Sequence, residues 1–298
     1  MNWKLKAVAV LLIKIYPFDS MSLYYYLQRK SGKLNKTTMD RRLHVLKSIF
    51  SISQKYNIPK DMNIFEIGTG RYPLFPIMYF TMGAKSIISY DLNRLLKYEL
   101  TETMIKSYLD NVHELSQDIR FNDSRINSLK EISSFQAFLE TLKMSYVAPT
   151  DARKTNLEKE SLDFVYSNAV FEHVYVSDIK LIHSEANRIL KPGGYILHNI
   201  DLSDHFSHSD RRLSRVNFLK FSDKFWNFLT KNTFFYQNRL RLSEHAKMIE
   251  ESGFKIIEKL TTCEEGELNS IDKINIKFES YSKEDLAVTN VIFLAQKI

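Results

Sequence analysis

Acidic residues stand at or near the ends of three successive apolar segments, where carboxylates can bind hydroxyl and amino groups. Glu66 lies in "NIFEIGT", Asp91 lies near the end of "SIISYDL", and Asp151 ends "SYVAPTD". If these segments are neighbouring parallel strands, their carboxyl ends form the edge at which open α/β sheets bind ligands. An acid after the second strand can accept both hydroxyls of a ribose, and one after the third can accept the amino group of adenine. Caps and solvated loop ends explain any single acid, but the ordered set favours a nucleoside site.

The turn around the first acid, "IFEIGTGRYP", has two glycines where a dinucleotide-binding fingerprint has three. Gly68 and Gly70 allow a ligand to approach the main chain closely. Pro73 occupies the position of the third glycine, which in the fingerprint gives tight helix packing near a pyrophosphate. The sequence therefore predicts a ligand site that need not cradle a phosphate.

Histidine and carboxylate side chains gather in two later segments, where they could move a proton. "NAVFEHV" contains a glutamate–histidine pair, and "HNIDLSDHFSHSD" contains several histidines and aspartates. Histidine changes its protonation near neutral pH, so it is suited to take a proton from an acceptor group. The catalytic candidates are His205, Asp201, His173 and Asp204.

Other interpretations of these segments stay open. The glutamate–histidine pair could simply support its loop. Asp201 with Asp204 or His205 could bind a divalent cation through oxygen and imidazole ligands. We expect a base here rather than a metal site. His198 alternates with apolar residues inside a segment, which is typical of a core histidine.

The apolar pattern predicts alternating strands and helices. Strands are expected at "NIFEIGT", "SIISYDL", "SYVAPTD", "LDFVYSN", "YILHNIDL", "FKIIEKLTT" and "LAVTNVIFLAQKI". Helical patterns cover 20–58, and a helix over about 178–190 should be closed by "KPGG". Ser243 should be the N-cap of the helix "SEHAKMIEESG". This alternation predicts an α/β fold with a doubly wound, mostly parallel sheet.

Five motifs in order resemble those of class I S-adenosylmethionine-dependent methyltransferases. They are "IFEIGTG", "YDL", "TDARK", "LDFVYSNAVFEHV" and "LKPGGYILHNI". The resemblance covers roughly residues 60–200, and it departs from the family pattern in the missing third glycine and in a long segment over 95–143. It implies a Rossmann-like fold with S-adenosyl-L-methionine as the cofactor, and this cofactor contains no phosphate.

The resemblance also implies roles for individual residues. Those facing the amino acid part of the cofactor would be Glu66, Gly68, Thr69 and Gly70. Asp91 would hold the ribose hydroxyls, with Leu92 against the adenine. The adenine edge would meet Asp151 and Ala152, and the sulfonium would lie near Asn168.

A third segment, "FFYQNRLRLSEH", follows the fifth expected strand, where such enzymes often shape the acceptor pocket. Arginine forks bind carboxylate or phosphate groups, and aromatic rings stack on sugars, so Tyr236, Arg239 and Arg241 are substrate-binding candidates. The alternative is a surface helix start. Together with "DLSDHF", these residues resemble methyltransferases of bacterial surface-polysaccharide synthesis. We therefore expect O-methylation of a sugar hydroxyl on an anionic glycan or glycan precursor.

Rival functions are methylation of RNA or of another small molecule, and a non-catalytic scaffold or sensor that binds the cofactor. The chain of 298 residues has 42 basic and 35 acidic residues, a net charge of +7, which favours an anionic partner. It has no dense basic run, so nucleic acid is not expected as a partner. The single cysteine, Cys263, excludes an internal disulfide and a Cys-based zinc site, and it favours a reducing, cytoplasmic compartment.

We expect two parts. The first is a helical N-terminal cap over 1–58, and the second is a Rossmann-like domain over 59–298 with a helical insertion over 95–143 and an irregular acceptor-side insertion over 202–242. The apolar run over 7–13 is too short to span a bilayer, which takes about 20 residues. It is expected to form an amphipathic helix that packs on the domain. Peripheral contact of this helix with a membrane surface is the alternative, because lysines and a tryptophan flank the run.

Overall fold

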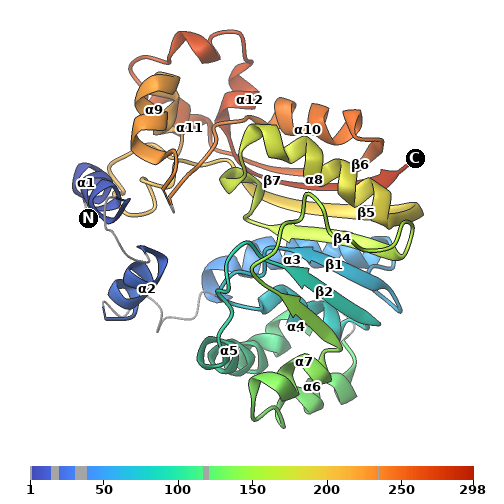
Figure 1. Cartoon of the computed structure of the whole chain (residues 1–298). Helices are drawn as coiled ribbons and strands as arrows, with labels where there is room; N and C mark the ends of the chain where they lie inside the picture. Colours follow the sequence, from blue (N-terminus) through green and yellow to red (C-terminus); the bar gives the residue numbers. More distant parts are fainter. Residues whose placement is uncertain (1, 15–19, 31–38, 117–120, 234) are drawn as a thin grey trace.

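A seven-stranded, mostly parallel sheet forms the centre of the molecule (Figure 1). The computed structural model describes residues 2–14, 20–30, 39–116, 121–233 and 235–298. The strand order is β3-β2-β1-β4-β5-β7-β6, and β7 pairs antiparallel with both of its neighbours. The strands are β1 Asn63–Ile67, β2 Ser86–Tyr90, β3 Met144–Val147, β4 Leu162–Asn168, β5 Leu190–Asp201, β6 Phe254–Cys263 and β7 Val288–Lys297. The predicted doubly wound, Rossmann-like α/β class is therefore confirmed.

The strand order reverses beside β1, and this reversal creates the crevice in which such sheets bind ligands. From β1 the chain moves outward through β2 to β3, then returns to the other side of β1 as β4 and β5. The carboxyl ends of β1, β2, β4 and β5 therefore meet at one edge. The expected nucleoside acids and the histidine segments all follow strands that end at this edge.

Two hydrophobic layers cover the faces of the sheet, because successive strand residues point to opposite sides. In β1, Ile64 is buried in one layer, and Phe65 is buried in the other. The first layer includes residues of α3, α4 and the three following helices; the second includes residues of α8 and α10. These helices are α3 Met39–Lys55, α4 Leu74–Thr81, α5 Tyr98–Ser116, α6 Asp123–Leu129, α7 Phe135–Thr141, α8 Val176–Ile189 and α10 Leu242–Glu251.

A third hydrophobic cluster lies beyond the carboxyl edge and joins the N-terminus to the segment after β5. Helix α1 (Trp3–Lys14) packs there beside α9 (Asp223–Thr230). The Nζ of Lys6 donates to the main-chain oxygen of His205 at 3.0 Å. This contact ties the N-terminal helix to the loop that carries the catalytic candidates.

Helix α2 (Ser20–Lys30) contacts residues that follow β1 and β2. Its Tyr25 hydroxyl donates to Glu99 at 2.7 Å, and its Gln28 accepts from the guanidinium of Arg71. The remaining short helices are α11 Glu265–Asn269, α12 Lys283–Ala287 and three 3-10 turns, at Phe171–His173, Asn217–Lys220 and Ile276–Phe278. None of the described helices is long and apolar enough to cross a membrane.

Three local predictions need correction. "KPGG" does not close a helix, because α8 ends at Ile189 and these residues already lie in β5. Ser243 is not the N-cap of α10; the cap is Arg241, whose amide donates to the Glu244 carboxylate at 2.9 Å. The segment over 202–242 is not wholly irregular, since it contains α9 and a 3-10 turn. Of the helical pattern over 20–58, residues 31–38 lie outside the described residues.

Candidate active site

Two adjoining hollows lie at the carboxyl edge of the sheet. The larger has a volume of about 310 Å³ and the smaller about 170 Å³. Both are lined by Gly68, Gly70 and Ala169, so they meet at the glycine turn. The larger hollow is lined on one side by residues of the β2 and β3 loops and on the other by residues after β4. A bent ligand with one broad and one narrow end would fit across the turn.

Both glycines of the turn have a backbone with positive φ. Gly68 has φ +77°, and a Cβ there would lie 2.8 Å from Cγ2 of Val170. Gly70 has φ +67°, and a Cβ there would meet no heavy atom within 4 Å. Positive φ strains any other residue, and the space beside Gly70 opens into both hollows. The main chain can therefore lie directly against a ligand.

Glu66 lines the smaller hollow from the end of β1, but its side chain is almost fully buried. Its carboxyl group accepts from the hydroxyl of Thr69, which also contacts Ser89. Burial raises the pKa of Glu66 to about 7, against the opposing effect of these hydroxyl contacts. The Glu66 side chain therefore holds Thr69 of the turn, and both residues line the smaller hollow.

Asp91 follows β2 and lies on the wall of the larger hollow. Its Oδ2 accepts from the amide of Gly70 at 2.9 Å, and its Oδ1 accepts from the amide of Asn93 at 3.2 Å. Each carboxylate oxygen has a second lone pair for a ligand hydroxyl. Burial raises the pKa of Asp91, while the two amides act in the opposite direction. This carboxylate therefore links the glycine turn to the place expected for a ribose.

Residues after β2 and β3 form the outer part of the larger hollow. Leu92 is 65% exposed on its rim, and Ala152 lies on its lining. Asp151 also lines it, but Arg153 binds this carboxylate at 2.6 Å and reaches Asp178 at 3.0 Å. The hydrogen bond from Arg153 lowers the pKa of Asp151. An adenine amino group would therefore share Asp151 with an arginine.

The smaller hollow has a polar and partly cationic lining. Asn168 lies there at the end of β4, and its Oδ1 accepts from Asn199 at 2.8 Å. Arg71, immediately after the glycine turn, also lines this hollow and donates to Gln28. Arg71 was not among the residues predicted from the sequence. A guanidinium here suits the carboxylate of an amino acid group.

His173 connects this cleft to the segment after β5. It lines the larger hollow, and its Nδ1 lies 2.7 Å from the main-chain oxygen of Tyr236. A carbonyl oxygen can only accept, so Nδ1 carries the proton and Nε2 is left as an acceptor. Desolvation by the surrounding protein and the neighbouring His205 lower the pKa of His173 to about 4. The His173 ring is therefore neutral at pH 7.

The catalytic candidates after β5 come together beside His173. The rings of His173 and His205 have centroids 5.0 Å apart, and those of His205 and His208 are 4.9 Å apart. Nε2 of His205 lies 3.3 Å from Oδ2 of Asp201, and Nε2 of His208 lies 3.6 Å from the same oxygen. Burial alone would raise the pKa of Asp201, but the two imidazoles hold it below its usual range.

Three of the predicted site residues have their polar groups bound within the protein. Asp204 is fully buried and accepts from the amide of Phe206 at 2.8 Å and from Asn217 at 3.2 Å, so its carboxylate closes its own loop. Arg241 is fully buried, with its guanidinium on main-chain oxygens that include Leu202 at 2.9 Å.

Arg239 is likewise buried, and its guanidinium binds the main-chain oxygen of Phe218 at 2.8 Å and the carboxylate of Asp223 at 2.5 Å. Neither arginine offers a free guanidinium to an acceptor. Tyr236 does lie at the site, because its main-chain oxygen binds His173 and its ring lies 4.3 Å from that of Tyr175. His198 is buried and contacts Ser167 at 2.8 Å, as expected for a core histidine.

The residues of the two hollows fit S-adenosylmethionine. The open space at Gly70 and the buried Asp91 carboxylate suit a ribose, while Leu92 and Ala152 offer apolar surface to an adenine. The smaller hollow, with Arg71, suits an amino acid group. Among the described residues that line the two hollows there is no lysine to bind a pyrophosphate.

Comparison with known proteins agrees with this assignment. Residues 85–198 match the family model for a methyltransferase domain. No curated protein matches the chain. Among solved structures, a Pyrococcus horikoshii protein has 11% identity and a TM-score of 0.50, and the alignment covers 92% of this chain and 98% of that one.

Two further solved structures are S-adenosylmethionine-dependent methyltransferases. The one from Methanosarcina mazei has 16% identity and a TM-score of 0.46, covering 83% of this chain and 97% of that one. The one from Mesorhizobium loti has 12% identity and a TM-score of 0.43, covering 83% and 96%. The match over residues 85–198 supports an S-adenosylmethionine-dependent methyltransferase with S-adenosylmethionine as its cofactor, and the Pyrococcus horikoshii structure shows the same fold.

Proposed function

We propose that the enzyme methylates a hydroxyl group, and that the imidazole–carboxylate cluster after β5 removes the hydroxyl proton. One observation carries this proposal: the buried Nε2 of His205 makes no hydrogen bond among the described residues, and it lies 3.3 Å from the carboxylate of Asp201. A proton taken up at this nitrogen would be stabilised by the adjacent negative charge. His173 lies between this cluster and the cofactor cleft.

S-adenosylmethionine, when bound, supplies an electrophilic methyl group. Asp91 and the glycine turn would hold its nucleoside, and Arg71 would bind its carboxylate. Asn168 lines the smaller hollow at the end of β4 and would lie near the sulfonium. His173 and His205 would orient the acceptor hydroxyl, and His205 would accept its proton. A positioned base of this kind contributes about 10²- to 10⁴-fold to a rate.

We further propose a sugar hydroxyl as the acceptor. The half-buried rings of Tyr175 and Tyr236, beside His173, offer an aromatic surface for a sugar face. The buried arginines no longer support an anionic glycan, so the net charge of +7 is what favours an acidic group on the acceptor. RNA is the competing acceptor, and RNA binding should weaken steeply as the salt concentration rises. A gel-shift assay at low salt that shows no shifted band would exclude RNA as the acceptor.

The acceptor can be sought directly. Glycans from a deletion strain should lack the mass of one CH₂ group that glycans from the parent strain carry, and complementation should restore it. Complementation with a His205→Ala variant should not restore it. Identical glycan masses in parent and deletion strains would contradict the glycan proposal, and incubation with a labelled cofactor and other acceptors would then identify the substrate class. A folded enzyme that transfers no label to any acceptor would favour the sensor interpretation.

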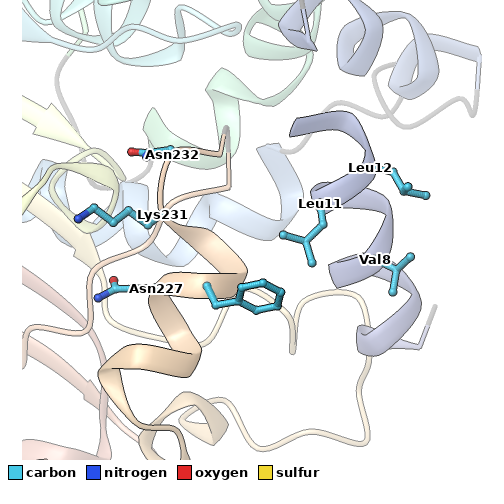
Figure 2. Close-up of a pocket in the computed structure, with 7 residues that line it drawn as sticks. Val8, Leu11, Leu12, Asn227, Lys231 and Asn232 are labelled. Carbon is cyan, nitrogen blue, oxygen red and sulfur yellow. The ribbon is translucent and has the colours of Figure 1, made fainter. Parts of the chain in front are cut away.

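We also propose that α1 and α9 contact the inner face of the cytoplasmic membrane. Large apolar side chains on these neighbouring helices are exposed: Leu5 66%, Val8 53%, Leu12 59%, Phe225 41% and Phe228 63%. Figure 2 shows that Val8 and Leu12 on α1 and Lys231 after α9 lie around one open hollow. The exposed side chains of Lys4, Lys224 and Lys231 flank this surface, so its charge complements anionic lipids.

Co-sedimentation with lipid vesicles tests this contact. The wild-type enzyme should sediment with phosphatidylglycerol vesicles and remain in solution with phosphatidylcholine vesicles. Leu12→Asp and Phe228→Asp should reduce sedimentation, because each places a charge in the apolar surface. Leu181→Asp is the matched control, since Leu181 is 52% exposed on the distant helix α8. Wild-type protein that sediments with neither kind of vesicle would refute the proposal.

A further inference from the structure

Two histidines converge on a single carboxylate oxygen at the end of β5. Nε2 of His205 and Nε2 of His208 lie 3.3 Å and 3.6 Å from Oδ2 of Asp201. All three donor atoms lie within 4.8 Å of one another. Asp201 closes β5 and both histidines follow within seven residues, so one short segment supplies the whole group.

Both contacts lie within ion-pair range, but they are longer than a charge-assisted hydrogen bond between nitrogen and a carboxylate oxygen, which measures about 2.7–2.9 Å. Two ligands that each lie about 2.1 Å from a tetrahedral zinc ion are separated by about 3.4 Å. The observed separations of 3.3 Å and 3.6 Å bracket this value. We propose that Asp201, His205 and His208 bind a divalent transition-metal ion.

The surroundings of the three side chains agree with this role. The buried Nε2 of His205 makes no hydrogen bond within the described part of the chain. Ser203 donates to Oδ1 of Asp201 at 2.6 Å, which orients the carboxylate so that Oδ2 faces the imidazoles. Nε2 of His208 lies 2.9 Å from the Ser203 hydroxyl. An ion would therefore replace one hydrogen bond of His208, while the bond from Ser203 to Asp201 stays in place.

The types of ligand atom determine which metal ion the site prefers. Imidazole ligands suit zinc, iron, copper and nickel, whereas magnesium and calcium prefer oxygen ligands throughout. Three protein ligands leave a tetrahedral ion with one open position, as in catalytic zinc sites. His205 also belongs to a second group, with Glu172 and His173, whose donor atoms lie within 4.8 Å. The ion would therefore sit next to a lining residue of the cofactor cleft.

This inference deepens the proposed hydroxyl methylation and rests on it for its chemical purpose. A divalent ion lowers the pKa of a bound oxygen group, so an acceptor hydroxyl in the open position would lose its proton more readily. The ion would then take over the activation that the proposed function gives to His205. Binding of an ion would overturn our expectation of a base rather than a metal site at this cluster. The third ligand would be His208, and Asp204 would not be a ligand.

Calorimetry on chelator-treated, full-length enzyme tests the site without an acceptor. We expect one Zn²⁺ per chain, no competition from Mg²⁺, and visible absorption bands when Co²⁺ occupies the site. Asp201→Asn and His208→Ala should each weaken Zn²⁺ binding by at least the roughly 10- to 100-fold that loss of an outer-shell partner costs. His113→Ala is the control for nonspecific histidine binding, because His113 lies on the distant helix α5.

Thermal unfolding must show that every variant is folded. Folded wild-type enzyme that binds no Zn²⁺ would overturn the proposal, as would equal affinity in the wild type and an Asp201→Asn/His208→Ala double variant. Failure here is separable from failure of the proposed function. If His205→Ala stops methyl transfer while the wild type binds no metal, His205 acts as a base alone.

Discussion

Replacement of Asp91 should separate cofactor binding from folding. In Asp91→Ala the ribose would lose two hydrogen bonds to a charged group, each worth about 1.5–3 kcal/mol. The expected loss is therefore about 3 kcal/mol or more, and every 1.4 kcal/mol corresponds to a factor of about ten in affinity. S-adenosylmethionine should bind at least about a hundredfold more weakly. The amide of Gly70 would also lose its acceptor at 2.9 Å, which adds to the loss.

Two further variants make this experiment decisive. Asp91→Asn keeps the shape and one acceptor oxygen, so its loss should be intermediate, about 10- to 100-fold. Asp163→Asn is the matched control, because Asp163 also accepts a main-chain amide, that of Asn63 at 2.8 Å, but lies at the start of β4 on the opposite edge of the sheet. Titration calorimetry with S-adenosylmethionine and S-adenosylhomocysteine measures all four proteins. Folded Asp91→Ala with wild-type affinity would refute the ribose assignment.

Three other predictions follow from the site and the core. His205→Ala should lose methyl transfer while cofactor affinity stays at the wild-type value; a fully active variant would remove His205 from the mechanism. Arg71→Met should weaken S-adenosylmethionine binding about tenfold or more but leave 5′-methylthioadenosine, which has no carboxylate, unaffected; equal losses for both ligands would contradict a carboxylate contact. Burial lowers the pKa of His183 to about 4 and that of His245 to about 3. Their neutral forms therefore stabilise the fold above the unfolded pKa of about 6.5, and each contribution, about 3 kcal/mol or more, is lost as pH falls toward the folded value. Denaturant unfolding should show this decline between about pH 7 and pH 4, and a stability unchanged over that range would oppose it.

The position of Asp91 could be expected from the sequence because the apolar pattern locates the end of each strand. The expected strands that carry Glu66, Asp91 and Asp151 are parallel and end at the same edge of the sheet, so these acids could be placed there without tertiary information. Arg71 was missed because its partner Gln28 lies 43 residues away on α2. A contact of this kind follows from packing and leaves no local pattern.

The acceptor half could be predicted only in part. The histidines after β5 lie close together, as their shared segment suggests, but charge alone could not distinguish a buried arginine from an exposed one. Arg241 satisfies main-chain oxygens between β5 and β7, and that role depends on how distant segments meet. The environment of Asp204 could not be predicted for the same reason. Its carboxylate is bound by residues of its own folded loop.

A crystal structure with bound S-adenosylhomocysteine would show where the cofactor binds. We expect the two ribose hydroxyls to bind the carboxylate of Asp91, the adenine to lie between Leu92 and Ala152, and the amino acid group to enter the smaller hollow toward Arg71. A nucleoside located away from this edge of the sheet, or a cleft filled by protein at saturating ligand, would contradict this expectation.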